Sequence, residues 1–464
     1  MPDSNSSLNP LGSLPINTLL PKFAIPSIVA YLVTSLYNIV DQIFIGQGVG
    51  YLGNAATNVA FPFTTVSTAI ALMMGIGTAA NFNLNLEERA RRVAGTGLSC
   101  LALFSLTLGL IALFFRGPLL NLFGATPEVL PYAMIYTGIT AFGLPMVTFT
   151  TGASSLVRAD GSPTYSMLCT LSGAVLNTIL DPVFIFGLDM GVAGGALATV
   201  LGQALSLVMV LYYLFRTRIR TIRLTAASLH PSGPLLRAIC SLGVSPFLNQ
   251  MAMFLVQITL NNTLTYYGAL SHYGEDIPLA CVGVISKVNI LMLGFTLGIS
   301  QGCQPIFSYN YGARQYSRVR EAYRKAIVAA SVICCIAFVC FQLFPRPIVA
   351  LFDPSGSEEY FQFAERYFRI YMFMTLANAF QPITANFFTS IGKAKRGALI
   401  ALTRQVIFLI PLILIFPLFL GIDGVMYAGP IADSAAVVVA LALVTREMKR
   451  MPHVDEPVAA DTLV

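Results

Sequence analysis

Charged residues are scarce in this chain of 464 amino acids: Asp, Glu, Lys and Arg make up 10% of it, against about 25% in a typical soluble domain. The apolar set AVILMFWYC accounts for 56%. A water-soluble protein of this size could not cover its surface with so few charges. Soluble enzymes and nucleic-acid-binding domains are therefore excluded, the net charge of +6 carries no nucleic-acid signal, and we expect an integral membrane protein.

Motifs for metal, disulfide or nucleotide chemistry are missing as well. The three histidines, His230, His272 and His453, fall in expected loops or in the tail, and none of the eight cysteines has C-x-x-C spacing. Neither a zinc site nor a disulfide framework is indicated. The sequence therefore predicts that the protein is not an enzyme and has no cofactor.

Twelve apolar runs between polar breaks are each long enough to cross a bilayer as a helix of about 20 residues. Several exceed about 25 residues, so tilted or broken helices are expected. The runs cover about 21–46, 55–82, 94–115, 131–157, 163–187 and 192–215 in the first half, and about 237–268, 277–309, 322–345, 360–391, 397–420 and 424–445 in the second.

Two segments of the first half resemble segments of the second half. GIGTAANFNLNLEERARRVA (75–94) closes the second run and resembles GISQGCQPIFSYNYGARQYSRVREA (298–322), which closes the eighth. GLDMGVAGGALAT (187–199) precedes the sixth run as GIDGVMYAGPIAD (421–433) precedes the twelfth. These matching places indicate a parallel internal repeat. The predicted fold is an all-α polytopic membrane protein with twelve transmembrane helices in two pseudo-symmetric six-helix bundles.

The basic residues predict how this fold is oriented. The loops on the side of the termini hold most of the 27 lysines and arginines, whereas the opposite loops hold only Arg116 and Arg346. Because basic loops stay in the cytoplasm, we expect a monomeric multi-pass protein of the cytoplasmic (inner) membrane with both termini inside. Its expected parts are a cytoplasmic tail (1–20), an N-terminal bundle (21–216), a basic cytoplasmic linker (217–236), a C-terminal bundle (237–446) and a cytoplasmic C-terminal tail (447–464).

Five motifs carry a family resemblance: DQIFIGQGVGYLGNAATNVAFPF (41–63), RADGSP (158–163), NTILDPVFIFG (177–187), GGALATVLGQ (194–203) and QPIFSYNYGARQ (304–315). In this order and spacing the sequence resembles the multidrug and toxic compound extrusion (MATE) transporters over nearly the whole chain. The resemblance implies two six-helix bundles forming a V, alternating access, and drug export driven by inward movement of Na⁺ or H⁺.

Acidic residues inside the membrane are costly and are therefore functional candidates. Counted from the outer loops at about 1.5 Å per residue, Asp41, Asp181 and Thr199 lie roughly 7–10 Å deep on three helices of the first half. Asn177 shares a helix face with Asp181, as Tyr37 does with Asp41. Packing or a near-interface position is the competing interpretation for each residue alone. As a set, two carboxylates with an amide and hydroxyls suit Na⁺ or a proton.

The resemblance assigns roles to this set. Asp41, Asn177, Asp181 and Thr199 match the residues that carry cation coupling, with H⁺ or Na⁺, in archaeal and related bacterial MATE proteins. Pro26 matches the proline at which the first helix of those proteins bends. The resemblance therefore implies that these residues couple transport to a cation. The sequence itself shows only that they lie at similar depths on three helices.

The second half lacks the acidic pair. The repeat places Asn261, Ile415 and Asp433 where the first half has Asp41, Asp181 and Thr199. Lys287 and Asp433 lie at about equal depth, which permits an ion pair. Together with Asn261 and Gln257 they form a second candidate polar site, either structural or with a role in substrate binding or coupling. Arg404 is expected to extend to the inner surface.

Acidic groups in a membrane cavity favour positively charged substrates, which would compete with the coupling ion for the same charge. We therefore expect a secondary active exporter of amphipathic, cationic small molecules by H⁺ or Na⁺ antiport through alternating access. The alternative is a flippase or exporter of a lipid-linked or specialised natural-product intermediate. An anionic lipid-linked substrate would require a basic cavity, for which Lys287 is the one clear candidate.

Overall fold

The computed structural model describes residues 10–49, 51–84, 87–123, 125, 127–215, 229–273, 276–350, 358–452 and 455. Every regular element in these residues is a helix. Most of the expected basic linker (217–236) and the outer parts of both expected tails lie outside the described residues.

The first half of the chain forms a bundle of six long helices, which we call the first lobe. These are α2 (Ile16–Val49), α3 (Tyr51–Leu84), α4 (Glu87–Phe114), α6 (Leu130–Ala159), α7 (Pro163–Pro182) with its π-helical end η1 (Val183–Gly187), and α8 (Gly191–Phe215). The bounds follow the six expected apolar runs to within a few residues at most ends.

The second half forms a second lobe of six helical segments, two of which are interrupted. The uninterrupted ones are α9 (Gly233–Ala269), α10 (Asp276–Gly312), α11 (Tyr316–Leu343) and α17 (Asp423–Arg450). The interrupted ones are α13 (Glu358–Tyr371), η3 (Met372–Ala379) and α14 (Phe380–Ser390) in succession, and α15 (Ala394–Leu402), η4 (Thr403–Leu409) and α16 (Ile410–Leu420) in succession.

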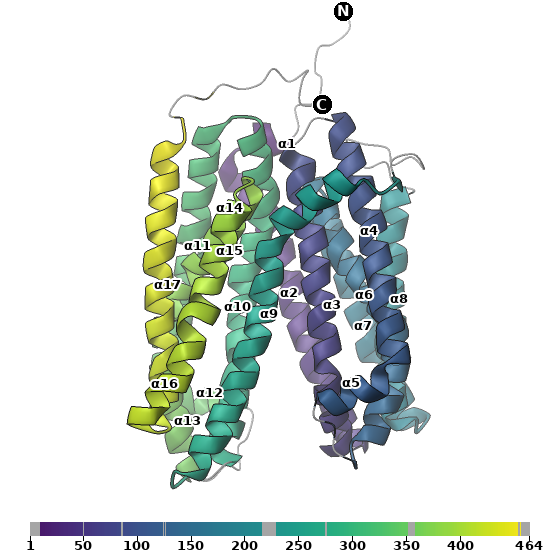
Figure 1. Cartoon of the computed structure of the whole chain (residues 1–464), viewed down its shortest axis with the longest axis vertical. Helices are drawn as coiled ribbons and strands as arrows, with labels where there is room; N and C mark the ends of the chain where they lie inside the picture. Colours follow the sequence, from purple (N-terminus) through teal and green to yellow (C-terminus); the bar gives the residue numbers. More distant parts are fainter. Residues whose placement is uncertain are drawn as a thin grey trace, which may run out of the picture.

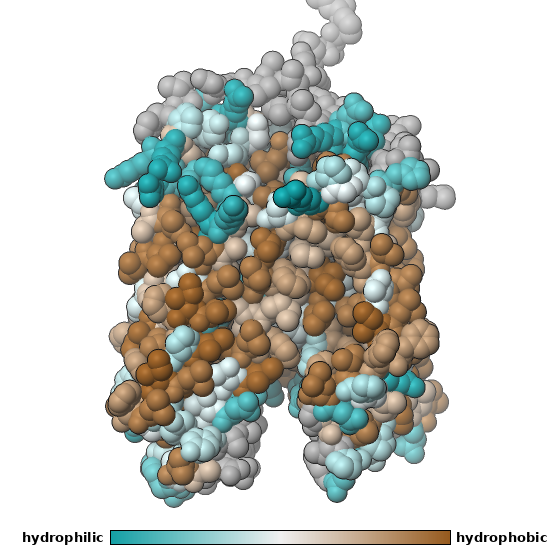
Figure 2. Space-filling model, in the orientation of Figure 1, coloured by the Kyte–Doolittle hydropathy of each residue, from teal (hydrophilic) through white to brown (hydrophobic). Residues whose placement is uncertain are grey.

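Eleven helical segments of the described residues are long and apolar enough to cross a membrane. The remaining expected span, 360–391, consists of α13, η3 and α14, and its backbone leaves the helical conformation at Met374 (φ −93°, ψ 25°). On the face shown in Figure 2, an apolar band crosses the middle of the molecule between two more polar ends, as a membrane-spanning surface requires.

Both ends of the described chain lie at the same end of the molecule (Figure 1). The guanidinium of Arg318, in the first turn of α11, donates to the carbonyl oxygen of Leu11 in the short helix α1 (Pro10–Ser13) at 3.2 Å. Arg320 donates to the carbonyl oxygen of Met451 at 2.9 Å. The start of α11 therefore holds the two ends of the chain together, which an even number of membrane crossings allows.

The lobes are in close contact toward this end. Helix α2 packs against α10 and α3 against α9, and a Cβ on Gly243 of α9 would lie 1.9 Å from the carbonyl oxygen of Met73 in α3. Arg158 donates to Gln301 Oε1 at 2.9 Å across the two lobes. Toward the opposite end a notch separates the lobes (Figure 2), so the molecule is V-shaped and open away from its termini.

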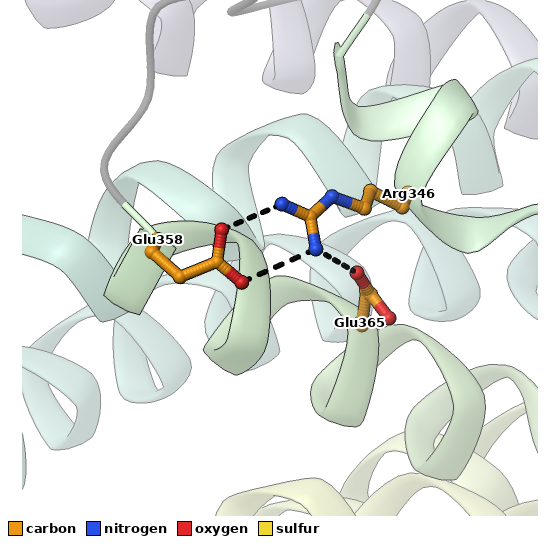
Figure 3. Close-up of polar contacts among 3 residues, drawn as sticks. All are labelled: Arg346, Glu358 and Glu365. Carbon is orange, nitrogen blue, oxygen red and sulfur yellow. Dashed lines mark hydrogen bonds and ion pairs between the residues drawn. The ribbon is translucent and has the colours of Figure 1, made fainter.

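Each lobe carries one short helix near its open end, α5 (Arg116–Leu122) in the first and α12 (Pro345–Ala350) in the second (Figure 1). Arg116 donates to the carbonyl oxygen of Met134 at 3.4 Å. Arg346 instead pairs with two carboxylates of α13, Glu358 at 2.6 Å and Glu365 at 3.5 Å (Figure 3). Its guanidinium also lies 5.0 Å from the centre of the Phe361 ring.

Candidate ion-coupling site

Helices α7 and α8 approach each other closely at a pair of glycines. A Cβ on Gly202 would lie 2.5 Å from the carbonyl oxygen of Gly173, so a larger residue does not fit there without a shift. About one turn away, the side-chain nitrogen of Asn177 donates to Asp181 Oδ1 at 3.3 Å and to Thr199 Oγ1 at 3.3 Å. The amide of Asn177 thus bridges the acid of its own helix and the hydroxyl of the next.

Asp41 reaches the same place from α2, which packs along α7. The carboxyl groups of Asp41 and Asp181 lie within hydrogen-bonding reach of each other. Asp41 is 8% exposed and Asp181 is fully buried. Tyr37, one turn before Asp41, interacts electrostatically with both carboxyl groups. The structure therefore brings together all five residues of the first-half set.

Three oxygens of this cluster are buried without a hydrogen-bond partner within the described part of the chain: Asp41 Oδ1, Asn177 Oδ1 and Asp181 Oδ2. Buried polar groups in folded proteins are nearly always paired, and an unpaired buried charge is very unfavourable. Among the described residues, no Lys or Arg acts electrostatically on either carboxyl group. No basic residue of the described chain balances the cluster, so a proton or a cation would have to supply its positive charge.

Two chemical species fit this requirement. A proton on one carboxyl group would let the two acids share a hydrogen bond and would leave one negative charge. Alternatively, a Na⁺ ion would find carboxylate, amide and hydroxyl oxygens on three helices, and oxygen is the ligand that hard cations prefer. The two species compete for the same oxygens, so binding one of them excludes the other.

Tyr136 is a member of the cluster that the sequence analysis missed. It comes from α6 and interacts electrostatically with Asp41, Tyr37 and Asp181. The same depth count would have found it. Tyr136 lies six residues after Leu130, where α6 begins, which places it roughly 9 Å deep and level with the two acids. Four helices of the first lobe therefore contribute to the site.

Pro26 lies in α2, away from the acids and toward the end that carries the termini. It is buried, and the hydroxyl of Ser27 donates to the carbonyl oxygen of Phe23 at 2.9 Å. The backbone around it packs on α10, where Gly302 lies against Phe23 and Ala24. A proline has no N–H for the helix ladder, so this is a weak point of α2 at the contact between the lobes.

The predicted ion pair between Lys287 and Asp433 is wrong. Asp433 pairs with Arg404 of η4, and the two side chains are 6% and 13% exposed, whereas Lys287 is exposed. The expectation that Arg404 reaches the inner surface is wrong for the same reason. Equal depth did not fix which way each side chain points around its helix, and Arg404 comes close to Asp433 from the neighbouring helix.

The other members of the second candidate site lie elsewhere. Gln257 donates to Asn261 Oδ1 at 2.9 Å, one turn apart on an exposed face of α9. They make an i,i+4 pair of the ordinary kind, whereas Asp433 pairs with Arg404. The four residues Lys287, Asp433, Asn261 and Gln257 therefore do not form one site.

In sequence, this chain is similar to known membrane transporters. The family model MatE matches residues 26–183 and 248–415, one match in each half of the chain. The multidrug export protein MepA of Staphylococcus aureus (strain bovine RF122 / ET3-1) is 25% identical over 445 residues, which cover 93% of this chain and 94% of the relative. MepA of Staphylococcus haemolyticus is 24% identical over 432 residues, covering 91% and 92%.

Two solved structures illustrate the likeness in fold. The MATE multidrug transporter DinF-BH is 33% identical, with a TM-score of 0.85 over 94% of this chain and 96% of that one. An outward-facing multidrug resistance transporter of the MATE family is 23% identical, with a TM-score of 0.89 over 97% of this chain and 100% of that one. The second likeness concerns the fold alone.

Proposed function

Because the chain belongs to the MATE family of transporters, we propose that it exports amphipathic, cationic small molecules by antiport with H⁺ or Na⁺. The observation that carries this proposal is the cluster of three unpartnered, buried oxygens around Asp41 and Asp181. A buried acidic site without an internal base has to take its positive charge from the surrounding solution. Such a site can release that charge again, which an antiporter needs.

The substrate class follows from the same charge and from the relatives. A cationic molecule in the notch would be attracted by the negative charge of the cluster and expelled when a proton or Na⁺ neutralises it. The relatives named above are multidrug exporters, and broad selection by charge and apolarity, rather than by shape, accounts for such a range. An anionic lipid-linked substrate would be repelled by the cluster.

The orientation in the membrane is part of the proposal. Basic residues gather at the end that carries the termini, which predicts that this end faces the cytoplasm and that the notch faces outward. Cations entering the notch would then move down the membrane potential, which is worth about 2.3 kcal/mol per charge per 100 mV if the whole field is crossed.

The transport cycle that we propose starts in this outward-open state. A cation binds at Asp41 and Asp181, α2 rearranges near Pro26, and the site closes around the ion while the substrate leaves. Return to the inward-open state requires the contact between α2 and α10 and between α3 and α9 to separate. The lobes, joined through the linker 217–236, would act as the two moving bodies.

The experiment is transport in proteoliposomes with a pH gradient and a Na⁺ gradient imposed separately. Tetraphenylphosphonium, a permanent lipophilic cation, serves as the substrate. We expect one of the two gradients to drive its movement in the wild-type protein, and the Asp41→Asn/Asp181→Asn variant to insert and fold normally but to show no gradient-driven transport. Wild-type rates in that double variant would refute the proposed site.

A further inference from the structure

An ion pair lies buried in the middle of the second lobe. Nε of Arg404 in η4 donates to Oδ1 of Asp433 in α17. Each residue lies ten positions from the start of its segment, Ala394 for the one and Asp423 for the other, which is roughly 15 Å along the helix. Because these two segments start at opposite ends of the lobe, the pair lies near mid-depth.

Within the described part of the chain, one further titratable group faces this pair. Tyr371, at the end of α13, interacts electrostatically with both Arg404 and Asp433, and its ring stacks on that of Tyr367 with 5.1 Å between centroids. Arg404 itself is the second residue of a π-helical turn. Such turns insert an extra residue into a helix and often mark functional positions.

The internal repeat shows which residues of the first lobe correspond to this ion pair. Asp433 stands in register with Thr199, the hydroxyl that binds Asn177 in the cluster of the first lobe. In the first lobe the fifth long helix provides the acid and the sixth the hydroxyl. In the second lobe the equivalent helices provide Arg404 and the acid. Arg404 lies eleven residues before Ile415, the equivalent of Asp181, and its guanidinium contacts Asp433, so a cation that belongs to the chain lies against the position equivalent to Thr199.

We propose that Arg404 is a tethered counter-ion that prevents the second lobe from binding a coupling ion, and that it thereby limits the number of ions exchanged per transported molecule. This inference rests on the proposed function, since it assigns the ion stoichiometry of the same antiport. Without the guanidinium, Asp433 would be a buried carboxylate with no partner, and it would recruit a proton or Na⁺ from solution.

The test is the coupling ratio in proteoliposomes, obtained from the membrane potential at which net tetraphenylphosphonium flux reverses under a fixed ion gradient. For Arg404→Met we expect the ratio of coupling ions to tetraphenylphosphonium to rise by about one, because one carboxylate has lost its fixed counter-ion. Arg404→Lys, which keeps the charge, is expected to keep the wild-type ratio. Arg404→Met/Asp433→Asn, in which the acid is also neutralised, is likewise expected to keep the wild-type ratio.

An unchanged ratio in a folded Arg404→Met protein would overturn the inference. If that variant does not fold, Arg404→Met/Asp433→Asn decides. Wild-type transport and a wild-type ratio in this double variant support a second lobe that binds no coupling ion. Loss of gradient-driven transport in the folded double variant refutes the inference. Gradient-driven transport that persists in Asp41→Asn/Asp181→Asn would refute the proposed coupling site instead, and the ratio measured with Arg404→Met would still be interpretable.

Discussion

The two lobes treat their buried acids differently. In the first lobe, Asp41 and Asp181 face each other, and no basic residue in the described ranges acts on them. In the second lobe, Asp433 pairs with Arg404, and Glu447, which is 1% exposed, pairs with two basic residues, Lys393 and Arg396. An acid neutralised by its own chain belongs to the scaffold, whereas an acid left open is available to a mobile ion.

This difference arose on a shared framework. The helices of the two halves follow each other in the same order, and each half has a short helix after its third long one. The polar residues differ at equivalent positions: Ile415 stands where the first half has Asp181, and Asp433 where it has Thr199. On the proposed assignment, one lobe holds an ion site and the other holds a fixed ion pair on the equivalent helices.

The largest effect is expected at the site of Asp41 and Asp181, which we call the open site because no described basic residue balances its charge. Asp181→Asn should abolish gradient-driven tetraphenylphosphonium transport, leaving only the leak of protein-free liposomes, because the amide cannot exchange a proton or balance a cation. Adding Ile415→Asp, which puts an acid at the equivalent place in the second lobe, should not restore transport. Recovery in that double variant would show that the lobes are interchangeable and that the comparison is wrong.

The second prediction concerns stability. Asp433→Asn leaves the guanidinium of Arg404 buried without its partner, which should lower the free energy of unfolding by about 3–5 kcal/mol. Arg404→Met/Asp433→Asn should recover most of this loss. Asp181→Asn, which removes one of two facing acids, should leave the stability in detergent unchanged or higher. Equal losses for Asp433→Asn and Asp181→Asn in thermal unfolding would contradict the assignment of the two acids to different roles.

Much of the fold and of the open site follows from the sequence. Long apolar runs dictated the helices, and the depth of Asp41, Asp181 and Thr199, combined with the i,i+4 spacing of Asn177, sufficed to predict their convergence. Asp41, Asp181 and Thr199 lie within about eight residues of the outer end of their helical segment, so counting over this short distance measures their depth well even across the π-helical η1. Tyr136 followed the same rule and could have been found by the same count.

The ion pair of the second lobe could not be predicted in this way. Arg404 is the second residue of the π-helical turn η4, where side-chain directions depart from those of a regular α-helix. Depth gave Asp433 a partner at the same level, Lys287, but no information on the direction of either side chain. The break at Met374 was likewise anticipated only as a consequence of span length.

A third prediction tests the surface on which the lobes meet. Gly243→Leu places a side chain against the backbone of Met73, so the contact between α3 and α9 cannot close, at a cost of about 1–3 kcal/mol. We expect the outward-open state to become less populated and export to fall several-fold. The matched control on the same helix is Gly233→Leu, where nothing lies within 4 Å of the added Cβ. Equal effects of both changes on transport would argue against closure at this contact.

The smallest effect is expected at the open ends of the lobes, where Arg116 of α5 and Arg346 of α12 have different hydrogen-bond partners. The hydrogen bond from Arg346 holds the pKa of Glu358 below its ordinary value of 4.5. A depressed carboxyl pKa adds stability above pH 4.5 that is lost as the pH falls through the folded pKa. Arg116 donates to a backbone carbonyl, which does not titrate in this range. Since Arg346 and Glu358 are 50% and 60% exposed, the gain is small.

Thermal unfolding measured from about pH 7 down to about pH 3 separates the two cases. Glu358→Gln should unfold at a slightly lower temperature than the wild type at neutral pH, and the difference should vanish in acid because the wild-type carboxyl group is then protonated as well. Arg116→Gln should shift the unfolding temperature by the same amount at every pH, because its partner carries no proton to gain. A pH-independent difference for Glu358→Gln would mean that packing of Arg346 on Phe361, and not the ion pair, stabilises the open end of the second lobe.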